Sequence, residues 1–461
     1  MPKIARFLIF VFFIVLSVSC SSDPKLIYPP DDAVNRVTDF YLFDDGKTFL
    51  YLNSNMNRKY DFGEIVLMEI DGDGDPVFKD SLLVPSISGK MKVSADEKSI
   101  FVTTRDKHGV VRAKITGKTG SYKLQYENGT KGDYPDILKT KKEPYALTLN
   151  EDESKLMVTH IMNGELSIVD VKTWKVIKTF KLKYGVTEIL YDNISGYFLA
   201  SHKSSGNISL IEARDTLEEF TVSARELPID LPTQGYDVRS LKQSGDGSVF
   251  YAAFQNSYQE SSYDYNYDED TAPQILTLKL EDKELKIVKT LAVSGSIGEL
   301  AVLPYSSEVE SKSNSGGETS SDADAAEENE AETDDTDAAE ENDGETDDTD
   351  AAEENDGETD DSDAAGENSG NKTVQRVGDM IFVSIPNDEK VLFIDSARNS
   401  IRDEISYKDD KKECKPYQLY AKSVSNTTGY LFVSCFQNDR VYIYSIDLMS
   451  EEIIRKIGVL E

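Results

Sequence analysis

The chain is 461 residues long and carries a formal net charge of −35 at pH 7, from 50 Lys or Arg against 85 Asp or Glu. So acidic a surface disfavours nucleic acid and anionic lipid as partners, because their phosphates would be repelled. The chain has three cysteines and three histidines, which leaves few positions for thiol or imidazole chemistry.

The N-terminus has the pattern of an export signal. Lys3 and Arg6 precede an unbroken apolar run over residues 7–16. That run is too short for a permanent membrane span, which needs about twenty residues. Small residues and Cys20 follow it, an arrangement that resembles a bacterial lipoprotein signal. We therefore expect residues 1–19 to be a signal peptide and Cys20 to become the lipid-modified N-terminus. An ordinary signal peptide with a chance cysteine is the alternative.

Residues 20–32 are expected to form a tether, since they contain Pro24, Pro29 and Pro30. Ser21 follows the cysteine, where an aspartate would indicate retention in the inner membrane. By analogy with sorting in Gram-negative-type bacteria, we expect an exported protein anchored by lipid in the cell envelope, at the outer membrane. Two or more acyl chains on one residue would anchor it stably.

A unit of four short strands is clearest between Glu143 and Leu182. Polar turns separate the apolar runs, which is typical of an antiparallel meander. The expected strands are residues 144–149, 156–160, 166–171 and 174–180. Such a sheet cannot bury both faces alone, so further copies must pack against it.

The unit recurs along the chain. Its second strand begins at Phe49, Ile100, Leu156, Phe198, Phe250, Ile381 and Leu431. These positions are 42 to 56 residues apart, except for one interval of 131 that contains an acidic insertion. Seven copies predict an all-β fold over residues 33–461, a seven-bladed β-propeller of four-stranded antiparallel blades. A two-sheet sandwich is the competing interpretation, but it gives no reason for a fixed period.

Two of these strands resemble the repeats of the YVTN-type (lactonase-like) β-propellers. They are Leu431–Cys435 (LFVSC) and Leu166–Asp170 (LSIVD). An intact Tyr-Val-Thr-Asn is absent, and residues 158–160 and 436–438 stand in its place. The resemblance covers residues 33–461 apart from the insertions. It implies the propeller fold and leaves function open, because that fold includes enzymes, electron-transfer subunits and binding scaffolds.

An alternation of aspartate and glycine, Asp71 to Asp75, has the look of a calcium loop. Pro76 stands where such a loop has glycine, and Leu82 where it has a bidentate glutamate. The stretch also falls where a hairpin turn is expected, and Asp and Gly favour turns. We therefore expect a turn and no metal.

Two of the three histidines, His160 and His202, occupy the same position in successive units. They could lie together at one mouth of the propeller and bind a metal or move a proton. The same position holds Asn53, Thr104, Phe254, Ile385 and Cys435 in other units. No third ligand has convincing spacing, so a structural role is the favoured interpretation, without metal or cofactor.

A loop of the fifth unit, residues 257–270, contains four tyrosines among carboxylates and amides. They are Tyr258, Tyr263, Tyr265 and Tyr267. Tyrosine provides contact area at low entropic cost, so this loop is a candidate ligand surface. A solvated insertion without a partner is the alternative.

Residues 306–372 form a low-complexity insertion in the sixth unit. Residues 325–337, 338–350 and 351–363 are three copies of thirteen residues. Residues 308–371 contain 27 acids and one base, so this tract holds −26 of the total charge of −35. It has almost no bulky apolar residue and cannot offset the entropy of ordering, which predicts disorder. Weak binding of divalent cations is an alternative role.

Without Cys20, the chain retains one pair of cysteines, Cys414 and Cys435. The first is expected to begin the first strand of the last blade, and the second to end its second strand. Those positions lie side by side in an antiparallel hairpin, so an exported chain should form a disulfide there. Metal binding by two isolated cysteines is the weaker alternative.

These features favour a membrane-anchored envelope lipoprotein whose propeller is a binding or assembly scaffold. Its expected partners are the membrane, through the anchor, and an unidentified envelope protein or small ligand. No catalytic motif such as Gly-x-Ser-x-Gly or His-Glu-x-x-His is present. The alternative is a lactonase-like envelope hydrolase acting at the channel mouth. A cluster of His160, His202 and carboxylates at one mouth would favour it.

The lipid anchor is directly testable. We expect Cys20 to be acylated in the mature protein, and C20A to move the protein from the membrane fraction to the soluble fraction. Each buried methylene of an acyl chain contributes about 0.8 kcal/mol to membrane binding. Intact-mass measurement that finds an unmodified Cys20, or cleavage at another site, would contradict this prediction.

Overall fold

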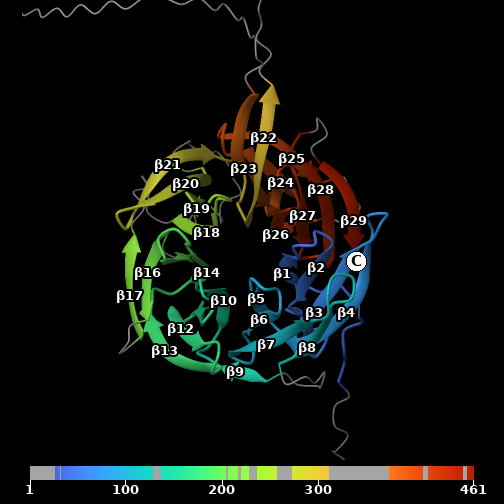
Figure 1. The fold of residues 1–461 in the computed structure, drawn as a ribbon, viewed down its shortest axis with the longest axis vertical. Helices are drawn as coiled ribbons and strands as arrows, with labels where there is room; N and C mark the ends of the chain where they lie inside the picture. The colour runs from blue at the N-terminus through green and yellow to red at the C-terminus, as the bar shows by residue number, and fades with distance from the viewer. Residues whose placement is uncertain are drawn as a thin grey trace, which may run out of the picture. The chain divides into compact units, whose positions relative to one another are not determined.

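A computed structural model of the protein describes residues 26–31, 33–127, 136–203, 206–215, 220–227, 236–256, 272–310, 373–408, 414–449 and 454–461. Met1–Ser307 and Arg376–Glu461 belong to one compact unit. In that unit seven antiparallel sheets are arranged as a ring around a central axis (Figure 1). The predicted all-β, seven-bladed propeller is confirmed.

The first four blades follow one another along the chain, and blade two alone divides its fourth strand, as β8 and β9, which both pair with β7. Their strands are β1 (Val37–Leu42), β2 (Thr48–Asn53), β3 (Phe62–Ile70) and β4 (Pro76–Pro85); β5 (Ser88–Val93), β6 (Ser99–Thr104), β7 (Gly109–Thr116), β8 (Lys123–Tyr126) and β9 (Ile137–Lys139); β10 (Pro144–Leu149), β11 (Lys155–His160), β12 (Glu165–Asp170) and β13 (Lys175–Lys181); β14 (Val186–Tyr191), β15 (Phe198–His202), β16 (Ile208–Asp215) and β17 (Phe220–Leu227).

The last three blades repeat the order, and a short 3₁₀ helix, η2 (Pro386–Asp388), lies in blade six. Their strands are β18 (Tyr236–Gln243), β19 (Phe250–Asn256), β20 (Gln274–Glu281) and β21 (Glu284–Ala292); β22 (Leu300–Glu310), β23 (Thr373–Ile385), β24 (Lys390–Asp395) and β25 (Ser400–Ser406); β26 (Pro416–Ser423), β27 (Thr428–Cys435), β28 (Arg440–Asp447) and β29 (Ile454–Leu460).

Blade three matches the strands expected from sequence closely. Its first strand is the predicted one, and the other three differ by about one residue at their ends. Trp174 is the exception, because it was expected to begin the fourth strand. Its φ of 52° places it in the turn before β13, in the left-handed region that ends a tight hairpin turn.

The core is divided among the seven interfaces between neighbouring blades, with one hydrophobic cluster at each. The second strand of blade one shows why. Phe49 and Tyr51 belong to the cluster shared with blade seven, whereas Leu50 and Leu52 belong to the cluster shared with blade two. Successive side chains of a strand point to opposite faces, so a strand buried on both faces is apolar throughout.

The interface between blades seven and one closes the ring. No N-terminal strand completes the last sheet, so this closure depends on side-chain packing between the two blades. Its cluster has thirteen buried apolar members among the described residues, against seven between blades two and three. Phe40 stacks on Phe432 at 5.6 Å, and Ser434 donates a hydrogen bond to the carbonyl of Val37 at 3.0 Å. Side-chain packing and this hydrogen bond therefore close the ring.

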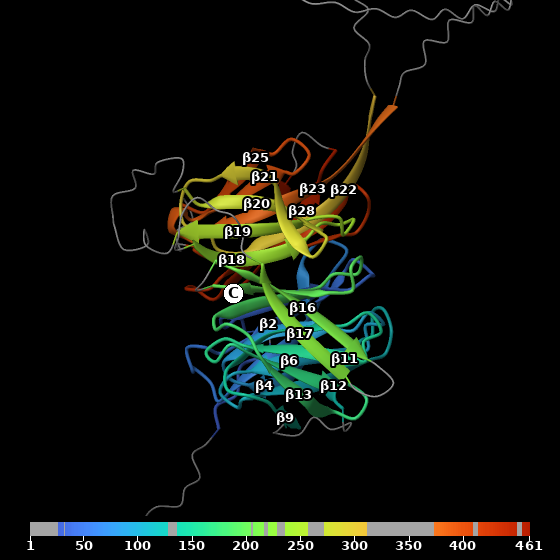
Figure 2. The same ribbon diagram turned by 90° about the vertical axis from the view of Figure 1, so that its left-hand side faces the viewer.

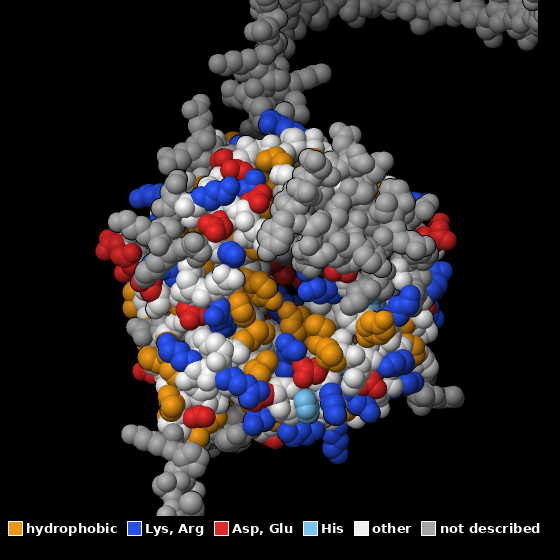
Figure 3. Space-filling view, turned by 180° about the vertical axis from the view of Figure 1, so that it is seen from behind, with side chains coloured by type: hydrophobic (Ala, Val, Ile, Leu, Met, Phe, Trp, Pro, Cys, Tyr) orange, Lys and Arg blue, Asp and Glu red, His pale blue; other side chains and the backbone are white. Residues whose placement is uncertain are grey.

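The two ends of the ring differ in their connections. Loops between blades, and loops between second and third strands, lie at one end, here called the loop face. Hairpin turns between first and second strands, and between third and fourth strands, lie at the other end, the hairpin face. In Figure 2 the arrowhead of β19 points to the left, the side that Figure 3 shows, so Figure 3 looks onto the loop face.

The acidic insertion falls inside blade six, as predicted. β22 and β23 are neighbours in the sheet although residues 311–372 separate them in sequence. The chain therefore leaves and returns at the hairpin face. The low-complexity tract itself lies outside the described residues.

The aspartate–glycine motif of blade one is a hairpin turn, which confirms that expectation. Asp71 accepts hydrogen bonds from the backbone N–H groups of Asp73 and Asp75, at 2.9 Å each, through one carboxylate oxygen. It joins β3 to β4. Its carboxylate therefore organises the turn, as short polar side chains commonly do.

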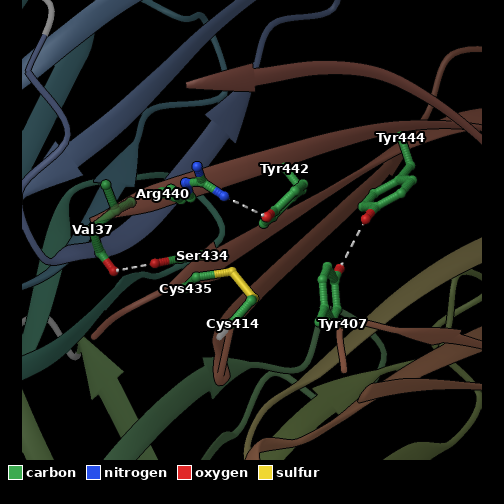
Figure 4. Close-up of a disulfide and its surroundings, with 8 residues drawn as sticks. All are labelled: Val37, Tyr407, Cys414, Ser434, Cys435, Arg440, Tyr442 and Tyr444. Atoms are coloured by element: carbon green, nitrogen blue, oxygen red, sulfur yellow. Dashed lines mark hydrogen bonds between the residues drawn. A yellow bond between two sulfur atoms is a disulfide. The ribbon is translucent and has the colours of Figure 1, made fainter. Parts of the chain in front are cut away.

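Cys414 and Cys435 form the predicted disulfide (Figure 4). Cys435 ends β27, and Cys414 lies just before β26, with 5.1 Å between the two Cα atoms. Both residues are buried in the cluster between blades six and seven. The bond therefore ties the segment that enters blade seven to the end of its second strand.

We expect reduction of this disulfide, or C435S, to lower the free energy of unfolding by about 3 kcal/mol, because the bond closes a loop of about twenty residues. Limited proteolysis should cut blades six and seven first, since both cysteines pack at their interface. S434A is the matched control, because the neighbouring hydroxyl bonds blade one instead. Free thiols in the exported protein, or first cleavage in blades three and four, would contradict the prediction.

Candidate functional site

The two histidines at equivalent positions in blades three and four have structural roles. His160 and His202 are fully buried at the ends of β11 and β15. In each, one ring nitrogen contacts a backbone carbonyl eighteen residues earlier, and the other contacts a serine hydroxyl on the third strand. Each imidazole therefore ties the loop that enters its blade to the second strand.

Other residues at the same position in the blade make the same tie with different chemistry. Asn53 accepts a hydrogen bond from the N–H of Asn35, also eighteen residues earlier, and donates one to the carbonyl of Ala33. Cys435 makes the tie covalently, to Cys414. We call these side chains the latch. In four blades, this position therefore has a common structural function.

The latch determines the protonation of His160. A carbonyl oxygen can only accept a hydrogen bond, so Nδ1 of His160 donates to the backbone carbonyl of Lys142 at 3.1 Å. Nε2 therefore accepts a hydrogen bond from the Ser167 hydroxyl at 2.9 Å. Burial lowers the pKa of this imidazole to about 4, against the carbonyl contact that acts to raise it. The ring is therefore neutral at neutral pH. Each imidazole is hydrogen-bonded within its own blade, and among the described residues neither joins a group of three His, Cys, Asp or Glu side chains that could hold a metal ion.

The channel mouth on the loop face is built by β-bulges. The pairing of the first and second strands shifts register near the start of the inner strand in six blades, all except blade six, whose pairing is not described. A bulge leaves an extra residue unpaired and turns its side chain out of the ladder. The residues that fall outside the strand register at these bulges include Lys90, Tyr145, Thr187, Arg239 and Tyr417, which all line one cavity of about 100 Å³.

A cluster of charged side chains crosses the axis below this mouth. The Nζ atom of Lys242 lies 2.5 Å from Glu188 and 2.7 Å from Glu299, and so joins the two carboxylates. The Ser240 hydroxyl lies 3.2 Å from a carboxylate oxygen of Glu188 and 3.1 Å from one of Glu299, so its single proton can be donated to either. The Leu241 N–H also donates to Glu188.

A second lysine completes this axial cluster. Lys90 donates to the Gln418 side chain at 2.7 Å and lies 3.9 Å from Glu299. Asp39 faces it from blade one and accepts a hydrogen bond from the N–H of Met91 at 2.8 Å. Charges from blades one, two, four, five and six thus meet on the axis, where neighbouring cations and N–H groups offset the cost of burying each carboxylate.

Burial, mutual repulsion and the neighbouring lysines give the two glutamates different pKa values. Burial and the charge of Glu299 raise the pKa of Glu188. Burial acts to raise the pKa of Glu299 too, but Lys242 and Lys90 outweigh it and lower that pKa. Burial likewise acts to lower the pKa of Lys242, yet the two glutamates raise it. Glu188 is therefore the member of the cluster most ready to hold a proton.

Two cavities lie on either side of the cluster. The small one is at the mouth, and a larger one, about 350 Å³, is lined by the middles of all seven inner strands. Lys90 and Glu188 line both cavities, so they separate the two. A third cavity, about 490 Å³, lies on the hairpin face among turns of blades five to seven, where Asp379 accepts a hydrogen bond from Tyr251 at 2.7 Å.

The remaining predicted site residues cannot be placed. Cys20 and the four tyrosines at 258, 263, 265 and 267 lie outside the described residues. Within the part of the chain that the structure describes, no three His, Cys, Asp or Glu side chains are grouped to hold a metal ion. No helix among those residues is long and apolar enough to cross a membrane.

The axial cluster was not found from sequence. Its members stand in different repeats and in no shared motif. The available signal was an ionisable residue within an inner strand, such as Glu188 within VTEILY or Lys90 within SGKMKV. In a propeller the first strand of each blade lines the axis, so such residues must converge there.

No protein-family model and no curated protein matches the chain. Among solved structures it is similar to hydrazine synthase of Kuenenia stuttgartiensis, at 8% identity and a TM-score of 0.53, over 92% of this chain and 98% of that one. It is also similar to a periplasmic gluconolactonase of Pseudomonas aeruginosa (10% identity, TM-score 0.46, 82% and 85% covered) and to virginiamycin B lyase of Staphylococcus aureus (10%, 0.46, 90% and 95%). These similarities concern the fold alone.

The His160 latch predicts acid sensitivity. Between pH 6.5 and about 4 the unfolded chain binds a proton that the folded imidazole does not, so stability falls as the pH falls through this window. The full loss is about 3 kcal/mol at the lower end. H160N, which copies the latch of Asn53, should remove this part of the dependence of melting temperature on pH. An unchanged slope in H160N would contradict the assignment.

Proposed function

We propose that this protein is an exported, lipid-anchored scaffold of a bacterial cell envelope that binds a partner through the hairpin face of its propeller. The observation that carries a binding role is the axial cluster. Lys242 contacts both glutamates, and Lys90 lies beside Glu299, so these carboxylates are held by cations of the protein itself. A reactive centre would need such groups directed at a substrate.

Export is supported by the N-terminal pattern and by the disulfide. Disulfides persist in oxidising compartments and are rare in the cytosol. The Cys414–Cys435 bond is a fully buried part of an inter-blade cluster. The basic head, apolar run and Cys20 then account for both export and anchoring.

The hairpin face is favoured for the partner because the tether approaches the loop face. The N–H of Ile27 donates a hydrogen bond to the Asp61 carboxylate at 2.6 Å, and the carbonyl of Ile27 accepts one from the N–H of Asp61 at 2.9 Å. Tyr28 stacks on Phe62. Asp61 belongs to the loop between β2 and β3, on the loop face. The hairpin face contains the 490 Å³ cavity and an isoleucine, Ile194, that is 68% exposed.

Photo-crosslinking in the cell of origin tests the binding face. A photoreactive residue at position 194, in the turn between β14 and β15, should give a discrete adduct of higher mass. The same residue at Ile177, 44% exposed on the outer strand β13, is the matched control and should give none. No adduct at position 194, or equal adducts at both positions, would contradict the proposal.

The hydrolase alternative rests on Glu188. Its raised pKa and its place between two cavities suit a general acid or base. A lactone or ester turned over by the protein, with turnover abolished in a folded E188Q variant, would replace the scaffold proposal.

A further inference from the structure

Charge is divided between the two faces of blades one to four, although the chain as a whole is strongly acidic. The described loop-face segments contain eight Lys or Arg against three Asp or Glu, a formal charge of +5. The described hairpin turns of the same blades contain four against eleven, a formal charge of −7. The loop-face segments are residues 54–61, 86–87, 105–108, 140–143, 161–164, 182–185, 203 and 206–207, and the hairpin turns are residues 43–47, 71–75, 94–98, 117–122, 150–154, 171–174 and 192–197.

Basic side chains are spread over the loop face of these blades. Figure 3 shows Lys and Arg side chains gathered over its lower half, with hydrophobic side chains around the central hollow. Lys141, Lys142 and Lys183 are all exposed there. Potentials from several cations within about one Debye length, roughly 10 Å, add to one another.

Large apolar side chains stand among these cations. Met162 is 67% exposed and Tyr184 is 66% exposed. Their loops lie side by side, because the N–H of Gly185 donates to the carbonyl of Ile161 at 2.8 Å. Cations beside exposed tyrosine and methionine form the combination that binds at a membrane interface, where the ring enters the headgroup layer.

The tether fixes where this surface lies relative to the anchor. Its contacts with Asp61 and Phe62 hold residues 27 and 28 on the loop face of blade one. Six residues from Cys20 to Leu26 then span at most roughly 20 Å. An acylated Cys20 would therefore keep the loop face close to the bilayer.

We propose that the loop face of blades one to four docks on the anionic surface of the membrane that holds the anchor. This inference rests on the proposed lipid anchor. The expectation that an acidic chain disfavours anionic lipid was based on the net charge of the whole chain. The net charge does not reveal that positive and negative charges lie on opposite faces of blades one to four. Docking turns the hairpin face, with its 490 Å³ cavity and the acidic turns of blades one to four, toward a partner away from the membrane.

The acidic insertion is the other candidate occupant of a basic surface. It leaves the fold from the hairpin turn between β22 and β23, at the opposite end of the ring. The tether, in contrast, enters on the basic face itself. The geometry therefore favours the membrane.

Vesicle co-sedimentation tests the proposal without the anchor. The chain from residue 20 onward, carrying C20A, retains every described strand and has no acyl chain. It should bind phosphatidylcholine vesicles containing about one third phosphatidylglycerol at low salt. Bound protein should fall at least tenfold in pure phosphatidylcholine, and at least tenfold at about 0.5 M salt, where screening shortens the range of the interaction.

Two variants with equal charge change locate the surface. Reversal of Lys59, Lys141, Lys142 and Lys183 to glutamate on the loop face should reduce binding at least tenfold. Reversal of Lys47, Lys98, Lys118 and Lys172 on the hairpin face of the same blades should change it less than twofold. All eight lysines are exposed. Equal thermal unfolding of the two variants shows that both remain folded.

Three results would overturn the docking proposal. One is no binding of the parent chain to anionic vesicles at low salt. Another is an equal loss of binding in the two variants. The third is binding only after deletion of residues 308–371, which would assign the basic surface to the acidic insertion. None of these bears on acylation of Cys20 or on crosslinking at position 194, so the docking inference can fail while the proposed function stands.

Discussion

Burial of both faces of every blade is the constraint on which this structure depends. A four-stranded sheet with apolar side chains on both faces has no stable form alone, and each blade here shares one cluster with the blade before it and another with the blade after it. Closure of the ring is what covers the two terminal faces. The cluster that joins blades seven and one covers those faces, with Phe432 in contact with Phe40 and Phe49.

The latch shows one structural requirement met by several kinds of side chain. Each blade must bring the incoming loop back beside the end of its second strand. A carboxamide does so at Asn53, an imidazole at His160 and His202, and a disulfide at Cys435. The choice matters for behaviour although it does not change the geometry. We expect the imidazole of His160 to make its blade sensitive to acid, and the disulfide to make its blade sensitive to reduction.

The polar and charged side chains that bear on function are concentrated at the axis and at the two ends of the ring. The bulges aim side chains such as Tyr145 and Arg239 into the mouth, and the inner strands carry Glu188 and Lys242 to the axis. Opposite charges there are held by each other. The unbalanced charge lies on the two faces instead, positive on the loop face and negative on the hairpin face of blades one to four. This separation of charge is the basis of our proposals that the loop face meets the membrane and that the hairpin face meets a partner.

The sequence by itself determined the number of blades, the strands within them, the position of the insertion and the disulfide. These depend on local alternation of apolar residues, on turn residues and on spacing, all of which act within one repeat. Tertiary structure alone decided that His160 and His202 are separate buried latches and that Lys90, Glu188, Lys242 and Glu299 meet. It also decided that a chain of charge −35 has a basic face. Those outcomes depend on bulge registers and on distances between residues in different blades. A repeat pattern assigns each residue to a strand, but only closure of the ring brings residues of different repeats within reach of one another.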